Sequence, residues 1–424
     1  MFVQRKGKIT GSLFLDLLVF NSESLKEQSL NDLSATLKDK YDIEIKKQSL
    51  HERFNEQAVL FLKSILEQML QKQIDKDELL SINENFNRIL IKDSVCFQID
   101  KSLAEYYPGS GGSASKASIR IQFEYDILRG EINDLSLNAF NDQDAKDSIA
   151  TIKLTEKGDL IIRDLAYMGI AVLKEIIKNL GYYLCRVSPS VYVFEIIEGE
   201  YVELNFKKIA NFMKKSNIQT MEKEVYLGSK EKLKVRLIMN LLPEEVVKKR
   251  LRKANENSKK KNRNQPSKEY KARLSLNLII TNADETLISA DQAWNYYRLR
   301  WQIELMFKIW KSICHIEKVK KVKKHRLECY IYSKIILIVL GWKIMWRIAK
   351  RLYSEESLVL SFYKGFKTLI RRKIDSLRNI FLLGTQSGAE FIQAFYDLSK
   401  TNHILEKKQQ NPTLHEILVM CLSD

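Results

Sequence analysis

YRLRWQIELMFKIWK, residues Tyr297 to Lys311, has the spacing of one amphipathic helix. At about 100° per residue, one side of this helix is apolar and the other carries a charged stripe roughly 80° wide. The members of the stripe are Tyr297, Arg300, Glu304, Lys308 and Lys311. A single acid therefore lies among cations and an aromatic ring, and the apolar side is expected to pack against the rest of the protein.

Two interpretations of this stripe are open. In the first, the cations bind phosphates while Glu304 binds a divalent metal ion, since hard cations prefer carboxylate oxygens. In the second, Glu304 only forms ion pairs with Arg300 and Lys308, each worth about 0.2–0.5 kcal/mol. The first interpretation requires further acids elsewhere in the chain.

Two further acids follow apolar runs that are typical of buried strands. Ser94–Asp100 (SVCFQID) and Leu160–Asp164 (LIIRD) each end in an aspartate. The weaker candidates nearby are Asp93 and Asp126. Asp100 and Asp164 are therefore candidate acids, and the alternative for a strand-terminal acid such as Asp100 is that it simply ends its strand or caps a turn.

The order of elements around these acids indicates a mixed α and β fold. Residues 118–127 alternate strictly between apolar and polar side chains, as in a half-buried antiparallel strand. In all, three strands are expected up to residue 140, and then a helix, a strand, a helix and a strand up to residue 187. We therefore predict an α+β fold with a ribonuclease-H-like core, a mixed β-sheet flanked by helices, and acids at the ends of its first and fourth strands.

The charge balance of the chain favours a polyanionic partner. Its 424 residues contain 70 Lys and Arg against 53 Asp and Glu, a net charge of +17. The five cysteines show no paired spacing, which argues against a zinc site or a disulfide framework. The most apolar run, Ile335–Trp342, is too short to span a bilayer and is expected to be a buried helix.

The regions outside the core have distinct compositions. Residues 1–90 have helical spacing, and a short second helix is compatible equally with a helix-turn-helix or with an ordinary bundle. That helix shows Lys46, Lys47, Gln48, His51 and Arg53. Residues 190–248 are rich in strand patterns, and the last hundred residues are helical. Between them, 248–273 contains twelve Lys and Arg, including Lys259, Lys260 and Lys261, and is expected to be a mobile segment that follows a phosphate backbone.

The spacing Tyr297-x2-Arg300-x3-Glu304-x6-Lys311 resembles the signature of the insertion-sequence-4 family of DDE transposases. Flanking words of this family also match, namely Thr281-Asn282 and Arg300-Trp301-Gln302-Ile303-Glu304. The similarity covers residues 90–330, with a weaker match before them. The family implies a DNA transposase that cuts at the terminal inverted repeats of a mobile element and joins 3′-hydroxyl ends to target DNA.

The resemblance also implies roles for individual residues. Asp100, Asp164 and Glu304 become the catalytic and metal-binding acids, holding two Mg²⁺ ions about 4 Å apart, for which Mn²⁺ can substitute. The expected DNA contacts are Tyr297, Arg300, Lys308, Lys311, Trp301, Lys259, Lys260 and Lys261. Trp294 and Trp301 flank the stripe and are equally compatible with base stacking or with a core role.

The same resemblance gives a domain plan and an expected setting. The plan is a helical DNA-binding domain at 1–90, a first core part at 91–188, a β-rich insertion with a basic linker at 189–273, a second core part at 274–330 and a helical region at 331–424. A homodimer on DNA in the bacterial cytoplasm is expected, with no membrane association. Lys101 and Ala166 depart from the residues usual in the family, which keeps open a non-catalytic DNA-binding derivative, and a stand-alone nuclease is the third alternative.

Overall fold

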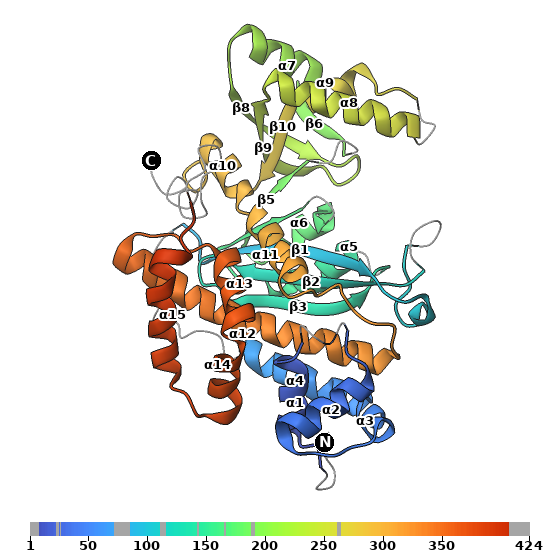
Figure 1. Ribbon diagram of the computed structural model, residues 1–424. Coiled ribbons are helices and arrows are strands. Elements are labelled where there is room, and N and C mark those ends of the chain that lie inside the picture. Colours follow the sequence, from blue (N-terminus) through green and yellow to red (C-terminus); the bar gives the residue numbers. More distant parts are fainter. Residues whose placement is uncertain are drawn as a thin grey trace.

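The chain folds around one ten-stranded sheet, which a computed structural model describes at residues 8–22, 25, 27–71, 85–110, 116–141, 144–164, 167–187, 191–260 and 264–406. The strands lie in the order β3-β2-β1-β4-β5-β10-β9-β8-β6-β7 (Figure 1). Their bounds are β1 Arg88–Gln98, β2 Ser118–Asp126, β3 Ile132–Ala139, β4 Asp159–Arg163, β5 Tyr182–Arg186, β6 Val193–Ile197, β7 Glu200–Glu203, β8 Thr220–Leu227, β9 Leu233–Leu241 and β10 Leu276–Thr281.

The first five strands and their helices form the ribonuclease-H-like half. β1, β4 and β5 are parallel to one another, and β2 and β3 complete the sheet in antiparallel fashion. Helix α5 (Asp144–Thr151) with the short η4 (Ile152–Leu154) connects β3 to β4, and α6 (Ile170–Lys178) connects β4 to β5. The predicted order of strands and helices is confirmed. Strand β1 is longer than predicted, because it begins at Arg88 instead of Ser94.

The insertion continues the same sheet. β10 is hydrogen-bonded to β5 on one side and to β9 on the other, so the strand after the insertion joins both halves. The insertion also contains three helices, α7 (Phe206–Lys215), α8 (Glu244–Lys260) and α9 (Lys268–Leu274). Most of 248–273 therefore lies in helices α8 and α9, and i,i+4 pairs such as Arg252–Glu256 help to stabilise α8.

The stretch from Tyr297 to Lys311 forms two helices instead of one. Helix α10 (Ala290–Arg298) begins at a capping box of Ser289 and Gln292, and α11 runs from Trp301 to Ser312. Between them the backbone N–H of Arg300 bonds to the carbonyl of Tyr297 at 3.3 Å, a tight i→i−3 turn. The sequence contains no Gly or Pro at this point, so the break has no signal in the residue pattern.

Helix α12 (Lys324–Glu356) is the central helix of the core. It is long and apolar enough to cross a membrane by length and composition, but 83% of its most apolar 18-residue window is buried inside the protein. The Trp342 ring packs edge-on against Tyr125 of β2 at 5.0 Å, and its Nε1 donates to the carbonyl of Gly130 at 2.8 Å. The prediction of a buried apolar helix at Ile335–Trp342 is confirmed.

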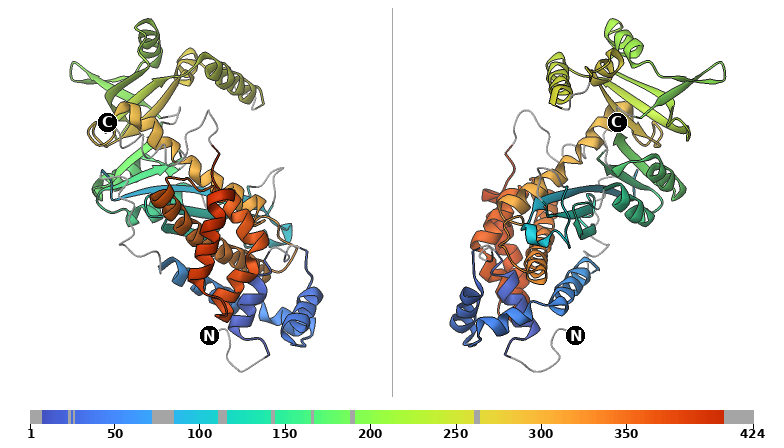
Figure 2. Two further views of the ribbon diagram at one scale, coloured as in Figure 1. Left: turned by 60° about the vertical axis from the view of Figure 1, so that its left-hand side comes forward. Right: turned by 90° about the vertical axis from the view of Figure 1, so that its right-hand side faces the viewer.

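Helices from both ends of the chain pack around α12. The N-terminal helices are α1 (Gly11–Val19), α2 (Leu30–Tyr41), α3 (Lys47–Arg53) and α4 (Glu56–Gln71). The C-terminal elements are α13 (Phe362–Arg372), α14 (Ile374–Arg378), the π-helical turn η6 (Asn379–Leu383) and α15 (Gly388–Asn402). Asp16 of α1 pairs with Arg378 at 2.8 Å, which ties the two ends together. The N-terminal helices and the insertion lie at opposite ends of an elongated molecule (Figures 1 and 2).

Candidate active site

Two aspartates lie at the same level of two neighbouring parallel strands, Asp93 within β1 and Asp164 directly after the end of β4. In the β1–β4 ladder, Lys92 is paired with Arg163, so the next residue on each strand is Asp93 and Asp164. Successive side chains of a strand point to opposite faces, and paired residues share a face. Lys92 and Arg163 therefore point to one face of the sheet, and Asp93 and Asp164 point to the other.

Glu304 reaches the same face from α11, which packs against β1. Arg300, the residue before α11, connects it to the strand acids. Nη1 of Arg300 donates to Oδ2 of Asp93 at 3.1 Å, and Nη2 donates to Oε1 of Glu304 at 2.7 Å. We call Asp93, Asp164 and Glu304 the carboxylate cluster, and Arg300 is the cation that bridges two of its members.

The electrostatics of the cluster confirm this proximity. The pKa of Asp93 is raised to about 6, mainly by burial and further by the charges of Asp164 and Glu304, after the lowering effects of the Ser94 N–H and of Arg300. Burial alone would lower the pKa of Arg300, but Tyr297, Asp164 and Asp93 raise it above its ordinary value. Negative charge is therefore concentrated around Arg300.

The placement of Asp100 corrects the sequence-based expectation. Its Oδ1 accepts from the backbone N–H of Ser102 at 2.9 Å and from the Ser102 hydroxyl, and these bonds lower its pKa. Its other oxygen lies 3.9 Å from Nζ of Lys321. Asp100 thus caps the short η3 helix (Lys101–Leu103). At about 3.3 Å per residue, the seven residues from Asp93 to Asp100 span up to about 23 Å, so the two cannot share a metal pair about 4 Å wide.

Asp93, a weaker candidate in the sequence analysis, is the acid that the structure brings beside Arg300 and near Asp164 and Glu304. The expected strand began at Ser94, which left Asp93 outside it and made Asp100 the strand-terminal acid. A partial signal was present, because the family often has a small residue and then a hydroxyl residue after its first acid, and the small Ser94 follows Asp93 directly, although Val95 comes next. With Asp93 in this place, the departure noted at Lys101 no longer concerns the first acid. Ala166 lies outside the described residues.

The donor chemistry of the cluster fits a divalent cation. Three carboxylates are the hard oxygen ligands that Mg²⁺ and Mn²⁺ prefer. Within the described part of the chain, however, no three acidic, histidine or cysteine side chains lie close enough to hold a metal ion in common. The guanidinium of Arg300 supplies positive charge between Asp93 and Glu304 instead.

The opposite face of the same two strands carries a buried ionic network. Nζ of Lys92 lies 2.6 Å from a carboxylate oxygen of Asp134 and 2.6 Å from one of Asp147. Arg163 pairs with Glu124 at 2.5 Å, and its Nη1 donates to the Ser148 hydroxyl at 2.7 Å. Because each cation directly precedes an acid of the cluster in the sequence, this network anchors β1 and β4 beneath the site.

The expected DNA contacts on the stripe differ in accessibility. Tyr297 is buried and its ring stacks on Trp294 at 5.8 Å, so the core role applies to Trp294, which packs against the main hydrophobic core. Trp301 is 62% exposed. Lys308 is exposed, with Nζ 5.3 Å from the Tyr363 ring centre, and Lys311 is half-buried.

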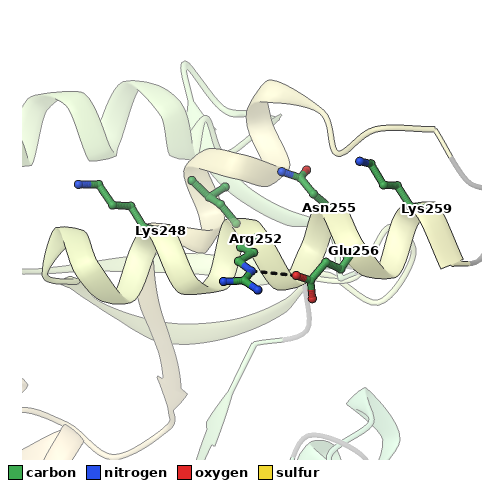
Figure 3. Close-up of a pocket in the computed structure, with 6 residues that line it drawn as sticks. Lys248, Arg252, Asn255, Glu256 and Lys259 are labelled. Atoms are coloured by element: carbon green, nitrogen blue, oxygen red, sulfur yellow. Dashed lines mark hydrogen bonds and ion pairs between the residues drawn. The ribbon is translucent and has the colours of Figure 1, made fainter.

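The basic residues of α8 form an exposed helical surface. Helix α8 has no buried residue, and Lys259 and Lys260 lie exposed in its last turn. A shallow hollow of about 480 Å³ runs along it, lined by Lys248, Leu251, Arg252, Asn255, Glu256 and Lys259 (Figure 3). All six residues belong to this one helix, so the hollow is a groove of the surface. Lys261 lies outside the described residues.

Comparisons with known proteins identify the family of this chain. The family described as Transposase DDE domain matches residues 84–340, the range that holds the whole carboxylate cluster. The transposase for insertion sequence element IS231F of Bacillus thuringiensis subsp. israelensis is 30% identical over 98% of this chain and 90% of that relative. The transposase for insertion sequence element IS1151 of Clostridium perfringens is 33% identical over 87% of this chain and 81% of that relative. The chain therefore belongs to the DDE transposase family, as the spacing around Glu304 indicated.

Proposed function

We propose that this chain is the transposase of an insertion sequence, cutting DNA at the terminal inverted repeats of its element and joining the 3′-hydroxyl ends to target DNA. The observation that carries the proposal is the meeting of Asp93 and Asp164 at one level of the sheet, with Glu304 connected to Asp93 through Arg300. The names of the relatives support the substrate.

Asp93, Asp164 and Glu304 are the residues that we assign to the metal-dependent chemistry. DDE transposases generally use divalent metal ions, and we propose Mg²⁺, for which Mn²⁺ can substitute. When bound, such ions stabilise charge on the phosphate and on the attacking and leaving oxygens. Asp93 takes the place first expected for Asp100, since Asp100 is engaged as the cap of η3.

The roles of the protein side chains in the reaction follow from their positions. The rigid β1–β4 ladder fixes Asp93 and Asp164, and α11 brings in Glu304 from a separate element. Water and a 3′-hydroxyl serve in turn as nucleophiles, so no covalent enzyme intermediate is required. Arg300, Lys308 and Lys311 place positive charge beside the acids, where it offsets that of the scissile phosphate.

The remaining assignments concern the wider surface. We assign Lys259 and Lys260, with Lys261, to the DNA backbone, because α8 presents them to solvent. The exposed Trp301 is a candidate for stacking on a displaced base, while Tyr297 needs local opening before it can contact DNA. Joining two element ends requires a homodimer on DNA. We place the protein in the bacterial cytoplasm without membrane association, since the apolar window of α12 is mostly buried.

The test uses a plasmid that carries this gene with its native flanking DNA. Purified protein is incubated with the plasmid in Mg²⁺, with Ca²⁺ as a control, and cuts are mapped to the nucleotide. Asp93→Asn and Glu304→Gln are expected to abolish cutting at paired inverted repeats, whereas Asp100→Asn, the matched control, keeps it. Loss of cutting in Asp100→Asn with activity retained in Asp93→Asn would reverse our assignment of the first acid.

The same assay separates the alternative functions. Binding of the inverted repeats without cutting in Mg²⁺ or Mn²⁺ would support a non-catalytic DNA-binding protein. Cutting without any joined product, when a second supercoiled plasmid is supplied as target, would support a stand-alone nuclease. Cutting followed by joining supports the transposase.

A further inference from the structure

Arg300 makes its two side-chain hydrogen bonds with atoms of the carboxylate cluster. It donates to Oδ2 of Asp93 at 3.1 Å and to Oε1 of Glu304 at 2.7 Å. Its side chain is 12% exposed, and that of Asp93 is 22% exposed. The contact with Glu304 is an i,i+4 pair in which the Glu304 side chain is 47% exposed. The contact with Asp93 is different, because it places the guanidinium between a helix and a strand 207 residues away in sequence.

We infer that Arg300 is an internal counter-ion of the carboxylate cluster, which divalent metal must displace and which DNA phosphate releases. This inference rests on the function proposed above, since it concerns the regulation of the same site. It predicts that metal loading and DNA binding are coupled through one side chain.

The atoms used by Arg300 explain why displacement is needed. The other oxygen of Asp93, Oδ1, already accepts the backbone N–H of Ser94 at 2.8 Å. Oδ2 is the oxygen of Asp93 that shares Arg300 with Glu304, so an ion that bridges the two acids through these bonded oxygens takes the place of the guanidinium. A guanidinium and a divalent cation at the same pair of oxygens also repel each other.

The position of Arg300 gives the released side chain a second partner. It lies at the start of α11, on the same charged stripe as Lys308, whose side chain is exposed. An arginine fork matches a phosphate as well as a carboxylate, through paired N–H donors. A DNA phosphate brought to the site therefore competes with Asp93 and Glu304 for Arg300 and frees both acids for metal.

Binding equilibria of two ligands coupled in this way are reciprocal. DNA must raise the metal affinity of the protein by the same factor by which metal raises the affinity for DNA. In the protein without DNA, the bridged form keeps the site poorly loaded. Removing the guanidinium should therefore increase the metal affinity of the protein without DNA. It should also abolish most of the increase in metal affinity that DNA causes.

The test is a metal-binding measurement on the full-length protein. Mn²⁺ binding is followed by the electron paramagnetic resonance signal of free Mn²⁺, with and without a duplex taken from the DNA that adjoins the gene. Arg300→Gln is expected to bind Mn²⁺ about tenfold more tightly than wild type without DNA, the value of one charge-assisted hydrogen bond. Arg298→Gln, the same charge change at the end of α10, is expected to match wild type.

Arg300→Lys serves as the second variant. It keeps the charge but lacks the fork that reaches two carboxylates, so an affinity between wild type and Arg300→Gln is expected. Thermal unfolding is recorded for every variant, and Arg300→Lys carries the test if Arg300→Gln does not fold. Equal or weaker Mn²⁺ binding in both Arg300 variants would overturn the inference.

Asp93→Asn distinguishes the two possible failures. If Asp93→Asn removes the Mn²⁺ binding of wild type and the Arg300 variants bind no more tightly, the inference fails and the proposed site stands. If Asp93→Asn leaves Mn²⁺ binding unchanged with and without DNA, the metal site of the proposed function fails as well.

Discussion

Nη2 of Arg163 lies 2.5 Å from Oε1 of Glu124, on the face of the sheet opposite Asp93 and Asp164. Both side chains are almost fully buried, at 1% and 0% exposed. A buried ion pair of this kind is costly to break, because loss of one partner leaves the other charge in a medium of low dielectric. The residue directly after Arg163 is Asp164, so the pair anchors the strand that carries one of the proposed catalytic acids.

Removal of Glu124 should therefore destabilise the protein strongly. For Glu124→Ala we expect a loss of about 3–5 kcal/mol in the free energy of unfolding, measured by urea denaturation. Glu224→Ala is the matched control, because Glu224 and its partner Lys234 are 57% and 62% exposed and a pair so open to solvent should contribute little to stability. Equal losses in the two variants would contradict a structural role for the buried pair.

Ionisation of Asp93 should lower the stability of the folded protein as pH rises, the opposite of the usual effect of a paired carboxylate. Its folded pKa of about 6 lies above the ordinary 3.8, so the folded protein holds this proton more tightly than the unfolded chain does. Ionisation therefore costs stability above about pH 6, and the cost disappears below about pH 4. In a metal chelator, Asp93→Asn should be more stable than wild type at neutral pH by about 2–3 kcal/mol, and no more stable near pH 4.

Asp100→Asn is the natural comparison for that experiment. The pKa of Asp100 is lowered by hydrogen bonds from Ser102, so its ionised form stabilises the folded protein, and this contribution is lost as pH falls. The variant should have a lower melting temperature than wild type at neutral pH, the reverse of Asp93→Asn. Melting curves recorded across this pH range check both signs, and a lower melting temperature for Asp93→Asn at neutral pH would refute the assignment of its shift.

Gly130 should tolerate no side chain. Its φ of +71° favours glycine, and a Cβ there would overlap the ring of Trp346. Gly130→Ala is expected to lose about 1 kcal/mol from the backbone and about 1–3 kcal/mol from overpacking. Gly199→Ala has a similar φ of +87° with open space around it, so the backbone term alone should remain. Thermal unfolding compares the two, and similar losses would mean that the Trp346 contact relaxes freely.

Helix α8 should contribute to DNA affinity through charge alone. Replacing both Lys259 and Lys260 by Gln should weaken binding evenly across DNA sequences and reduce the slope of log K against log salt by about 2. Fluorescence anisotropy at several salt concentrations gives the slope. Lys174 and Lys178, two exposed lysines of α6, provide a control pair with the same change in charge. An unchanged slope in the α8 variant would mean that Lys259 and Lys260 do not contact DNA phosphates.

Much of the catalytic core could be predicted because its signals are local. The strict alternation at 118–127 and the apolar runs around it determine strands, and the stripe around Glu304 is a helical pattern over about four turns. The first acid could not be placed in this way. Its identity depends on where β1 begins and on which residue lies level with Asp164, and both depend on pairing between strands more than sixty residues apart.

Two other differences have the same physical origin. The lysine-rich residues of α8 resemble a solvated charge run, and their helix rests on contacts with α9 and on pairs such as Arg252–Glu256 that a composition count does not distinguish. The break after Arg298 contains no helix-breaking residue, so packing of α10 and α11 on different parts of the sheet decides it. In each case tertiary contacts override a local pattern.

The position of β10 between β5 and β9 has a consequence for how this protein can be altered. All six residues of β10 are buried, and the strand has hydrogen-bonded neighbours on both sides. Excision of the insertion would leave a long apolar strand at an open edge, the arrangement most prone to pair with other chains and aggregate. The insertion therefore cannot be removed without exposing a core strand. Truncated or chimeric proteins that lack the insertion should aggregate and be recovered from inclusion bodies. Proteins in which the insertion is exchanged for that of a relative should keep β9 together with β10.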